Sequence, residues 1–397
     1  MKIVHIAPNA TFSDGWGFQD NLLPKYQSKL GHNVTMIVTT RTHGDGCKIH
    51  TLPGRFESVD GFTVIRLPYV KYKISLVTSI MCKLSVYDYL VEIQPDYIFF
   101  HGLSSATILD VIRYKKQCVK QGSKCVIVQD NHMDTYNIGK TGSKIKDTIL
   151  REYYKCLNRK SQKYVSRIYG VTPIRQQFAE EYFNIDHNKT DLLLMGADDE
   201  KIDFNHRDEI RNCIRKKYNI KDNEFLIVTG GKIDEKKKIH LLAEACGGLK
   251  DVKLLIFGSV VKEMQEQFSQ LTKKYKNIIY IGWVDSGAVY NYFFASDLVS
   301  FPGGHSVLWE QACASKVPCV FNRLTGMEHV NNGGNSTFFD KIDVDTIRRT
   351  IKELLFTEKY YVMKSIAQSN ATDIYLYSEI AKKSLEWADV SNEVFKE

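Results

Sequence analysis

The sequence predicts an α/β protein made of two doubly wound, Rossmann-like domains with a cleft between them. Three observations lead to this prediction. The chain has 397 residues, more than one hydrophobic core usually organises. Short apolar runs typical of strands alternate with amphipathic segments typical of helices, which is the pattern of a parallel sheet covered by helices. A charged stretch near the middle of the chain interrupts this alternation, which then begins again.

The first domain is predicted over residues 1–190. The run "KIVHIAP" (2–8) is of strand type, a glycine-broken loop and a helical segment follow it, and the run "NVTMIVTT" (33–40) completes a strand–helix–strand unit. A connection of this length favours parallel pairing of the two strands. Three more runs end in polar residues or glycine in the same way: "YIFFHG" (97–102), "CVIVQD" (125–130) and "RIYGVT" (167–172).

The second domain is predicted over residues 191–370, with the junction in the strongly charged stretch 190–222. In parallel sheets of this kind ligands bind beyond the carboxyl ends of the strands, so functional residues are expected where the runs end. The strand-type runs of this domain are "FLIVTGG" (225–231), "VKLLIFG" (252–258), "IIYIGW" (278–283), "LVSFPGG" (298–304) and "PCVFN" (318–322).

Charge and cysteine usage indicate which partners and which cellular compartment to expect. The net charge is +8, and the positive excess lies in residues 1–190, which contain 26 Lys and Arg against 16 Asp and Glu. Such a surface suits a membrane or a polyphosphate, although a merely soluble basic surface gives the same balance. The nine cysteines form no CxxC pair and the N-terminus lacks the apolar region of a signal peptide, so reduced thiols and a cytoplasmic protein are expected.

The segment "TGGKIDEKKKIHLLAEA" (229–245) predicts part of a binding site. Its two glycines let the backbone approach a ligand closely, and Lys232 and Lys237 are spaced to bracket a diphosphate. A solvated run of charges is the alternative explanation of these lysines.

The segment "FPGGHSVLWEQACA" (301–314) predicts a second part. Ser306 is expected to cap a helix that begins at Val307 and ends near Ser315, and the free amides of such a helix start attract phosphate. Glu310 lies one turn inside this helix and is predicted to accept hydrogen bonds from two adjacent hydroxyls, such as those of a ribose. The alternative is that Glu310 only complements the helix dipole.

Together these two segments resemble the family 4 retaining glycosyltransferases, which have the GT-B fold. "GGKIDEKKK" is similar to the family's glycine–basic–x4–lysine loop, and "SDLVSFPGGHSVLWEQACASKVPCVF" to its strand–helix segment with glutamates spaced E-x7-E. Further similar segments follow in the family's order over most of the chain: "KLGHNVTMIV", "QPDYIFFHG", "YGVTPIRQQFAEEY", "LLLMGADDEKIDF", "LLIFGS", "YIGWVDSGAVYNYFFASD" and "TGMEHVNNGGN".

The resemblance implies transfer of a sugar from a nucleoside-diphosphate sugar, a UDP-sugar being the commonest donor, with retention of the anomeric configuration. It also implies that residues 371–397 contain a helix that braces the first domain, which faces the acceptor. Lys232 and Lys237 match the basic pair on the donor diphosphate, and Glu310 matches the glutamate on the ribose. The other donor-binding residues that it implies are Gly15, Gly17, Gly304, His305, Ser306 and Val307.

The catalytic residues that the resemblance implies are His132, Asp130 and Lys237. His132 is expected near the donor sugar, and Asp130 and Asp134 are neighbours that would take its place in a shifted register. Glu328 is similar to a further glutamate of the family, whose role is less defined.

One position departs from the family. The first glutamate of E-x7-E, which contacts the donor sugar, falls at Pro302, so we expect His305 or a backbone group to replace it, and the identity of the sugar stays open. Two lysines and a helix start are sufficient to stabilise the charge on a leaving diphosphate. No DxD motif ends a strand-type run, and we therefore expect neither a metal nor another cofactor.

Two basic and apolar segments bear on the acceptor. Residues 140–163 contain eight basic and two acidic residues, and residues 69–84 are similar in kind. They predict a peripheral protein on the inner face of an anionic membrane, extending a glycan or lipid-diphosphate-linked acceptor of a bacterial surface. A solvent-exposed helix over the domain core is the alternative. The apolar residues at helical spacing on one face are Ile145, Ile149, Tyr153 and Cys156.

Other functions are also compatible with these patterns. A sugar-nucleotide epimerase of the same bipartite fold, or a non-catalytic sugar-nucleotide-binding protein, would use much of the same site. A nucleic-acid partner is disfavoured because no recognition motif accompanies the positive charge, and a dehydrogenase because no GxGxxG follows a strand-type run.

Overall fold

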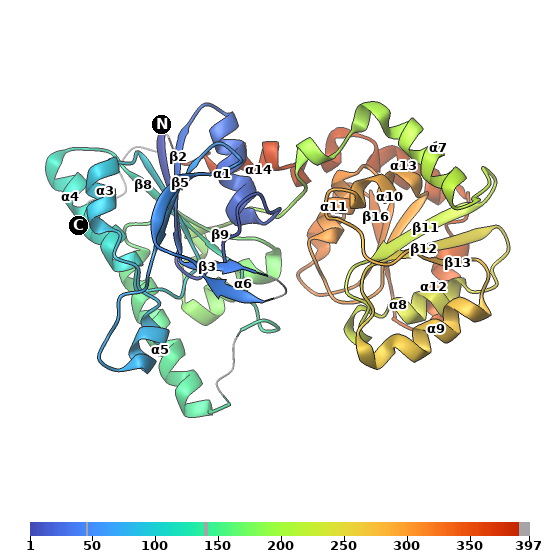
Figure 1. Ribbon diagram of the computed structural model, residues 1–397, viewed down its shortest axis with the longest axis horizontal. Coiled ribbons are helices and arrows are strands. Elements are labelled where there is room, and N and C mark those ends of the chain that lie inside the picture. Colours follow the sequence, from blue (N-terminus) through green and yellow to red (C-terminus); the bar gives the residue numbers. More distant parts are fainter. Residues whose placement is uncertain (45–46, 139–141, 389–397) are drawn as a thin grey trace. The chain divides into compact units, whose positions relative to one another are not determined.

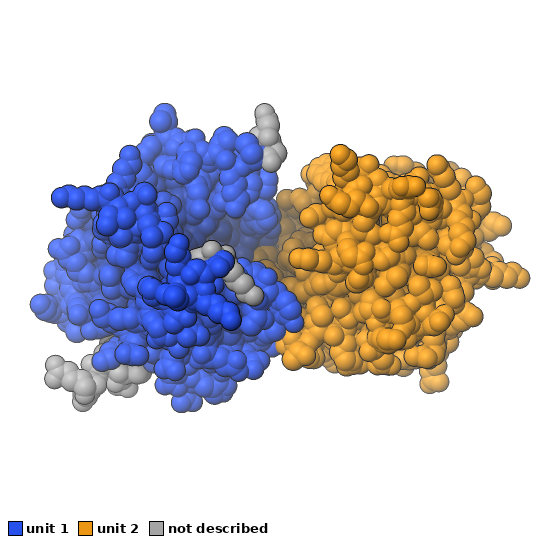
Figure 2. Space-filling view, turned by 90° about the horizontal axis from the view of Figure 1, so that it is seen from below, with its two compact units in different colours: residues 1–194, 380–397 blue, residues 195–379 orange. Residues whose placement is uncertain are grey.

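The computed structural model describes residues 1–44, 47–138 and 142–388. The chain divides into two compact units (Figure 2). Unit 1 contains Met1–Leu194 and the segment that begins at Ile380, and unit 2 contains Met195–Glu379. The chain therefore leaves unit 1 once and returns to it at its C-terminal end.

Unit 1 is a doubly wound α/β unit, as the sequence predicts. Its described strands form an eight-stranded sheet in the order β10-β9-β8-β7-β1-β2-β6-β5. Neighbouring strands pair in parallel, except the edge strand β5, which is antiparallel to β6. The strands are β1 (Lys2–Ala7), β2 (Asn33–Thr39), β5 (Gly54–Glu57), β6 (Thr63–Leu67), β7 (Tyr97–His101), β8 (Val126–Asn131), β9 (Arg167–Gly170) and β10 (Thr190–Leu192), with a separate hairpin of β3 (Arg41–His43) and β4 (Lys48–His50).

Helices cover this sheet (Figure 1). The central strands β7 and β8 are buried along their whole length, so that both faces of the sheet contribute to the apolar core. The helices are α1 (Gln19–Lys29), α2 (Ser75–Met81), α3 (Tyr87–Ile93), α4 (Ile108–Gln121), α5 (Lys144–Ser161) and α6 (Pro173–Phe183).

Unit 2 repeats the same architecture. Its described strands form a six-stranded parallel sheet in the order β13-β12-β11-β14-β15-β16. The strands are β11 (Phe225–Gly230), β12 (Val252–Phe257), β13 (Ile278–Tyr280), β14 (Leu298–Phe301), β15 (Cys319–Asn322) and β16 (Ser336–Phe339). The helices are α7 (Arg207–Lys217), α8 (Ile239–Cys246), α9 (Gln265–Lys274), α10 (Val289–Ala295), α11 (Leu308–Ala314), α12 (Val344–Lys352) and α13 (Glu358–Ala367), and α14 (Tyr377–Ser384) begins in unit 2 and ends in unit 1.

The charged stretch between the two sheets forms the helix α7 of unit 2. Arg211 and Arg215 of this helix donate hydrogen bonds to opposite oxygens of the Asp297 carboxylate, at 2.6 and 3.2 Å. Arg215 is buried, and Asp297 lies directly before β14. The charges of this stretch therefore anchor a helix to the sheet.

The chain re-enters unit 1 within α14. Ser384 accepts a hydrogen bond on Oγ from Gln27 Nε2 at 2.9 Å, and its carbonyl accepts one from the Tyr97 hydroxyl at 2.5 Å. The Arg167 guanidinium lies 3.7 Å from the ring centre of Trp387. Among the helices that the structure describes, none combines the length and apolarity needed to cross a bilayer.

Candidate functional site

The candidate site of unit 2 lies where β11, β12 and β14 end. Gly231 follows β11 with φ +105°, and Gly258 follows β12 with φ +117°. A Cβ atom on Gly258 would lie 1.8 Å from the Gly231 carbonyl oxygen, and one on Gly303 would lie 2.3 Å from the main chain of Lys237. Only glycine permits these close approaches. The two segments that the sequence singled out therefore pack directly against each other.

The two lysines of the first segment have different surroundings. Lys237 Nζ donates to the main-chain carbonyls of Gly304 and His305, at 2.6 and 3.0 Å, and burial lowers its pKa. Lys232 has a side chain that is 67% exposed and lies 3.5 Å from an Asp234 carboxylate oxygen. Lys237 thus fixes the loop before α11, whereas Lys232 presents a cation to solvent.

The start of α11 differs from the prediction. The helix begins at Leu308, and the capping position is Val307, in a helical conformation and without a side-chain cap. The prediction that Ser306 caps a helix from Val307 is wrong, because the Ser306 main-chain carbonyl, which accepts from Trp309 N at 2.9 Å, makes the first turn. Gly304 N donates to the Lys236 carbonyl at 3.1 Å, so this amide is also engaged.

Glu310 is completely buried and is held by two histidines. Its Oε1 accepts hydrogen bonds from His305 Nε2 at 2.7 Å and from His329 Nε2 at 2.8 Å. Burial alone would raise the pKa of this carboxyl, but the two histidines hold it well below its usual range. Oε2 has no hydrogen-bond partner among the described residues. We call His305, Glu310 and His329 the carboxylate clamp.

A similar cluster lies at the carboxyl ends of β7 and β8 in unit 1. Asp130 Oδ2 accepts hydrogen bonds from His101 Nδ1 at 2.9 Å and His132 Nε2 at 3.3 Å, and His101 Nε2 lies 3.0 Å from His5 Nδ1. His5 Nε2 in turn lies 2.7 Å from Gln27 Oε1. Asp130 is buried, whereas the His132 side chain is 40% exposed. Of the predicted catalytic residues, His132 and Asp130 are therefore in contact, with His132 at the surface.

The positions of the protons in this network follow from its contacts. Burial of His5, followed by the nearby His101, lowers the His5 pKa to about 3, so His5 is neutral. Burial lowers the pKa of His101 too, but the Asp130 carboxylate outweighs it and raises that pKa. A charged His101 donates on both sides, to Asp130 and to His5 Nδ1, and His5 Nε2–H then donates to Gln27.

The remaining predicted residues have more local roles in the structure. Asp134 accepts a hydrogen bond from Arg175 Nε at 3.0 Å and from two amides of the next turn, so it organises a loop. Gly15 has φ +70° and Gly17 is exposed, in a loop where Trp16 stacks on His43. Of three further positions, Pro302 is buried, Glu328 is exposed and Ser306 is half-buried.

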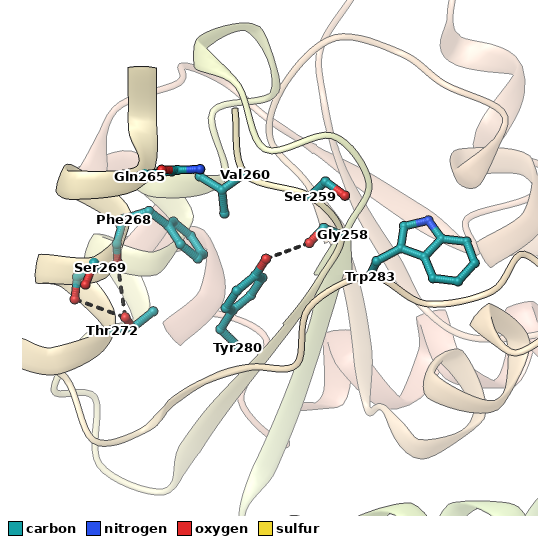
Figure 3. Close-up of a pocket in the computed structure, with 9 residues that line it drawn as sticks. All are labelled: Gly258, Ser259, Val260, Gln265, Phe268, Ser269, Thr272, Tyr280 and Trp283. Atoms are coloured by element: carbon teal, nitrogen blue, oxygen red, sulfur yellow. Dashed lines mark hydrogen bonds between the residues drawn. The ribbon is translucent and has the colours of Figure 1, made fainter. Parts of the chain in front are cut away.

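A cavity beside Gly231 was not predicted from the sequence. A cavity of about 370 Å³ is lined by residues that include Lys232, Trp283, Leu308 and Gln311. A second cavity of about 450 Å³ adjoins it, and both include Gly258, Ser259 and Trp283 (Figure 3). The Tyr280 hydroxyl, which lines the second cavity, donates to the Gly258 carbonyl at 2.8 Å. The exposed tryptophan at the end of the strand-type run 278–283 was the signal for this site.

Both histidine clusters have the ligand types of a transition-metal site. The ligand atoms of His305, Glu310 and His329 lie within 4.8 Å of one another, as do those of the cluster around Asp130. In both clusters, however, one ring nitrogen of each histidine already lies at hydrogen-bond distance from the carboxylate. The residues are therefore explained as hydrogen-bond networks.

Comparison with known proteins places this site in a known domain. Residues 210–368 match the family described as "Glycosyl transferases group 1". The chain is 26% identical over 198 residues to the processive diacylglycerol alpha-glucosyltransferase of Acholeplasma laidlawii. That alignment covers 45% of this chain and 59% of the relative, so the chain spans less than two thirds of that relative's length.

Solved structures share the fold of the whole chain. A glycosyltransferase from Rickettsia africae superposes with a TM-score of 0.68 at 15% identity, covering 98% of this chain and 97% of that one. Anabaena Alr3699/HepE, solved in complex with UDP and glucose, gives a TM-score of 0.59 at 14% identity, with 98% and 100% covered. The predicted GT-B fold is confirmed, and the match to the glycosyl transferases group 1 model lies within its second unit.

Proposed function

We propose that this protein is a glycosyltransferase that moves a sugar from a nucleoside-diphosphate sugar, with UDP as the expected nucleotide, to a glycan or lipid-linked acceptor. The observation that carries the proposal is the packing of the Gly231–Lys237 segment against Gly303–His305, beside the buried Glu310, inside the group 1 domain. Structures of the same fold were solved with UDP and glucose and with ADP and acarbose, which supports a nucleoside-diphosphate sugar as the donor.

The proposed chemistry needs charge stabilisation on the leaving diphosphate. Lys232 presents an exposed cation beside the cavity, and Lys237 holds the carbonyls of the adjacent loop so that its geometry is fixed before the reaction. Fixed donors and cations lower the barrier without reorganisation during the reaction. We propose retention of configuration and metal-independent transfer, with Glu310 on the ribose and His132 in unit 1 near the donor sugar.

The proposed acceptor is a lipid or a lipid-linked glycan at the inner face of a membrane. Helix α5 extends away from the sheet of unit 1 (Figure 1), and Ile145 and Ile149 on it are 75% and 62% exposed. The Tyr153 hydroxyl of α5 lies 2.7 Å from Met81 Sδ of α2. Leu76, which also belongs to α2, is 60% exposed. Apolar side chains among lysines on one surface are typical of helices that lie in a membrane interface. Lys140 of the predicted segment lies outside the described residues.

Thermal shift with nucleoside diphosphates tests the donor. A ligand at 100 times its dissociation constant adds about 2.7 kcal/mol to stability, and we expect UDP to raise the melting temperature more than ADP or GDP. Addition of a lipid acceptor to a UDP-sugar should then release UDP in proportion to product. Binding without any release of UDP would favour a non-catalytic binding protein, and conversion of the sugar without release would favour an epimerase.

A further inference from the structure

The carboxylate clamp has one feature that the proposed function does not explain. Glu310 Oε1 accepts from two histidines, while Oε2 has no partner in the described part of the chain. An ionised oxygen left without a partner in the interior is unfavourable, and such atoms in native proteins usually serve a function. The arrangement leaves one buried carboxylate oxygen without a hydrogen-bond donor.

Both histidines are themselves fixed by neighbouring groups. The His305 carbonyl accepts from Lys237 Nζ, and its ring packs edge-on against Trp309 with ring centres 5.3 Å apart. The His329 carbonyl accepts from the Tyr375 hydroxyl, and its Nδ1 has no partner within the described residues. Nε2 is therefore the nitrogen of His329 that has a partner, namely Glu310 Oε1.

We propose that His305 and His329 are positioning residues for Glu310, which occupy Oε1 and thereby leave Oε2 as the acceptor for a ribose hydroxyl of the bound nucleotide. This inference rests on the proposed function. Because Oε2 is enclosed in this structure, a hydroxyl reaches it only when neighbouring side chains shift on binding. His329, which lies 19 residues after Glu310 in a separate 3₁₀ turn, Glu328–Val330, is a residue that the glutamate spacing alone does not identify.

The test compares UDP with its 2′-deoxy and 3′-deoxy analogues by calorimetry. For the wild-type protein we expect at least one analogue to bind ~10-fold or more weakly, which is the usual effect of losing a hydrogen bond to a charged group. His329→Phe should reduce this discrimination several-fold by weakening UDP more than the analogue. His329→Gln, which keeps an N–H donor, should restore part of it.

Two comparisons separate positioning from a general loss of structure. In a Glu310→Gln background, His329→Phe should have no further effect on the discrimination, because His329 acts through the carboxylate. His240→Phe removes another buried histidine of unit 2, whose ring lies 3.7 Å from Glu235, and should leave the ratio unchanged. Additive effects of Glu310→Gln and His329→Phe, or an equal change in His240→Phe, would overturn the inference.

Other results distinguish failure of this inference from failure of the proposed function on which it rests. A folded wild-type protein that binds none of UDP, ADP and GDP would refute the proposed function and the clamp with it. Equal binding of UDP and both deoxy analogues would overturn the proposed role of the carboxylate clamp, and the proposed function would remain. If one equivalent of Zn²⁺ stabilises the wild-type protein but not Glu310→Gln, the cluster is a metal site and the inference is again overturned.

Discussion

Asp130 in unit 1 and Glu310 in unit 2 are buried carboxylates in similar surroundings. Each accepts hydrogen bonds from two histidines on a single oxygen. Burial on its own would raise both pKa values, and the histidines hold both well below the usual range. Removing one partner from such a pair leaves a buried charge with too few partners, which is why these clusters are sensitive to single substitutions.

The two lysines of the donor segment should have separable effects. Lys232 is exposed, so Lys232→Ala should leave the free energy of unfolding within about 0.5 kcal/mol of wild type. If Lys232 meets the diphosphate, the same change should weaken UDP binding by roughly 10-fold or more, because a charge-assisted hydrogen bond is lost. Calorimetry with UDP and chemical denaturation measure the two quantities on the same protein. Unchanged affinity in Lys232→Ala would exclude Lys232 as a diphosphate ligand.

Lys237 should behave in the opposite way. Its ammonium donates to two loop carbonyls, so Lys237→Met should lower stability by about 1.5–3 kcal/mol through loss of these hydrogen bonds. We expect UDP affinity to fall as well, since the loop before α11 loses its anchor. The measurement is urea denaturation, with Lys236→Met, an exposed neighbour, as the control. A variant as stable as the control would contradict the anchoring role.

At the scale of elements, helices α2 and α5 carry the exposed apolar side chains that we propose contact a membrane. Ile145→Glu with Ile149→Glu should abolish most binding to anionic vesicles, because two exposed apolar side chains would become acidic. Stability should change little, since both positions are exposed. Sedimentation with phosphatidylglycerol vesicles at low salt measures the binding.

Val119→Glu supplies the matched control for this surface. Val119 is 52% exposed on α4, and Val119→Glu is compared with the single variant Ile149→Glu, because each replaces one exposed apolar side chain by one acidic side chain. Because this position lies outside α2 and α5, the Val119→Glu variant should bind vesicles as the wild type does. Equal loss of binding in Val119→Glu would mean that net charge alone, rather than this surface, governs the attraction.

The central elements of the fold were predictable because the inner strands of each sheet, such as β7 and β11, are buried runs that end in glycine or polar residues. Glycines at 231 and 303 also indicated the site, since they permit a close packing that other residues do not. The direction in which the Lys237 side chain points could not be predicted, because the two carbonyls that accept its hydrogen bonds lie 67 and 68 residues further along the chain. The start of α11 was misplaced by one residue, because a serine before a helix is as compatible with a main-chain turn as with a cap.

His329 and Trp283 show the same limit for the site. Neither lies in a segment with regular periodicity, and each reaches the site through contacts made by the tertiary structure. Local sequence therefore located the main chain of the site, while long-range packing determined which side chains face it.

At the scale of the whole molecule, a histidine network links the sheet of unit 1 to the returning segment and should make stability depend on pH. The His5 network connects β1, β7 and β8 with α1, and Gln27 extends it to Ser384 in the segment that re-enters unit 1. His5 has a pKa of about 3 in the folded protein and about 6.5 in the unfolded chain. Between these values the unfolded chain binds one more proton than the folded protein, so stability falls as the pH falls.

The expected slope from this single group is up to about 1.4 kcal/mol per pH unit below pH 6.5. The raised pKa of His101 acts in the opposite direction, but only above pH 6.5, and Asp130 contributes only near and below its usual value of 3.8. The window from pH 6.5 to 4.5 therefore isolates His5 within this network.

His5→Gln tests this prediction. The variant should be less stable than wild type at pH 7.5, because the interior network loses an imidazole, and the difference should shrink steadily as the pH is lowered to 4.5. Urea denaturation at each pH, followed through the transition of unit 1, gives both curves. Parallel curves for the two proteins would mean that His5 takes up its proton without unfolding, and the neutral His5 on which the proton positions of this network depend would then be wrong.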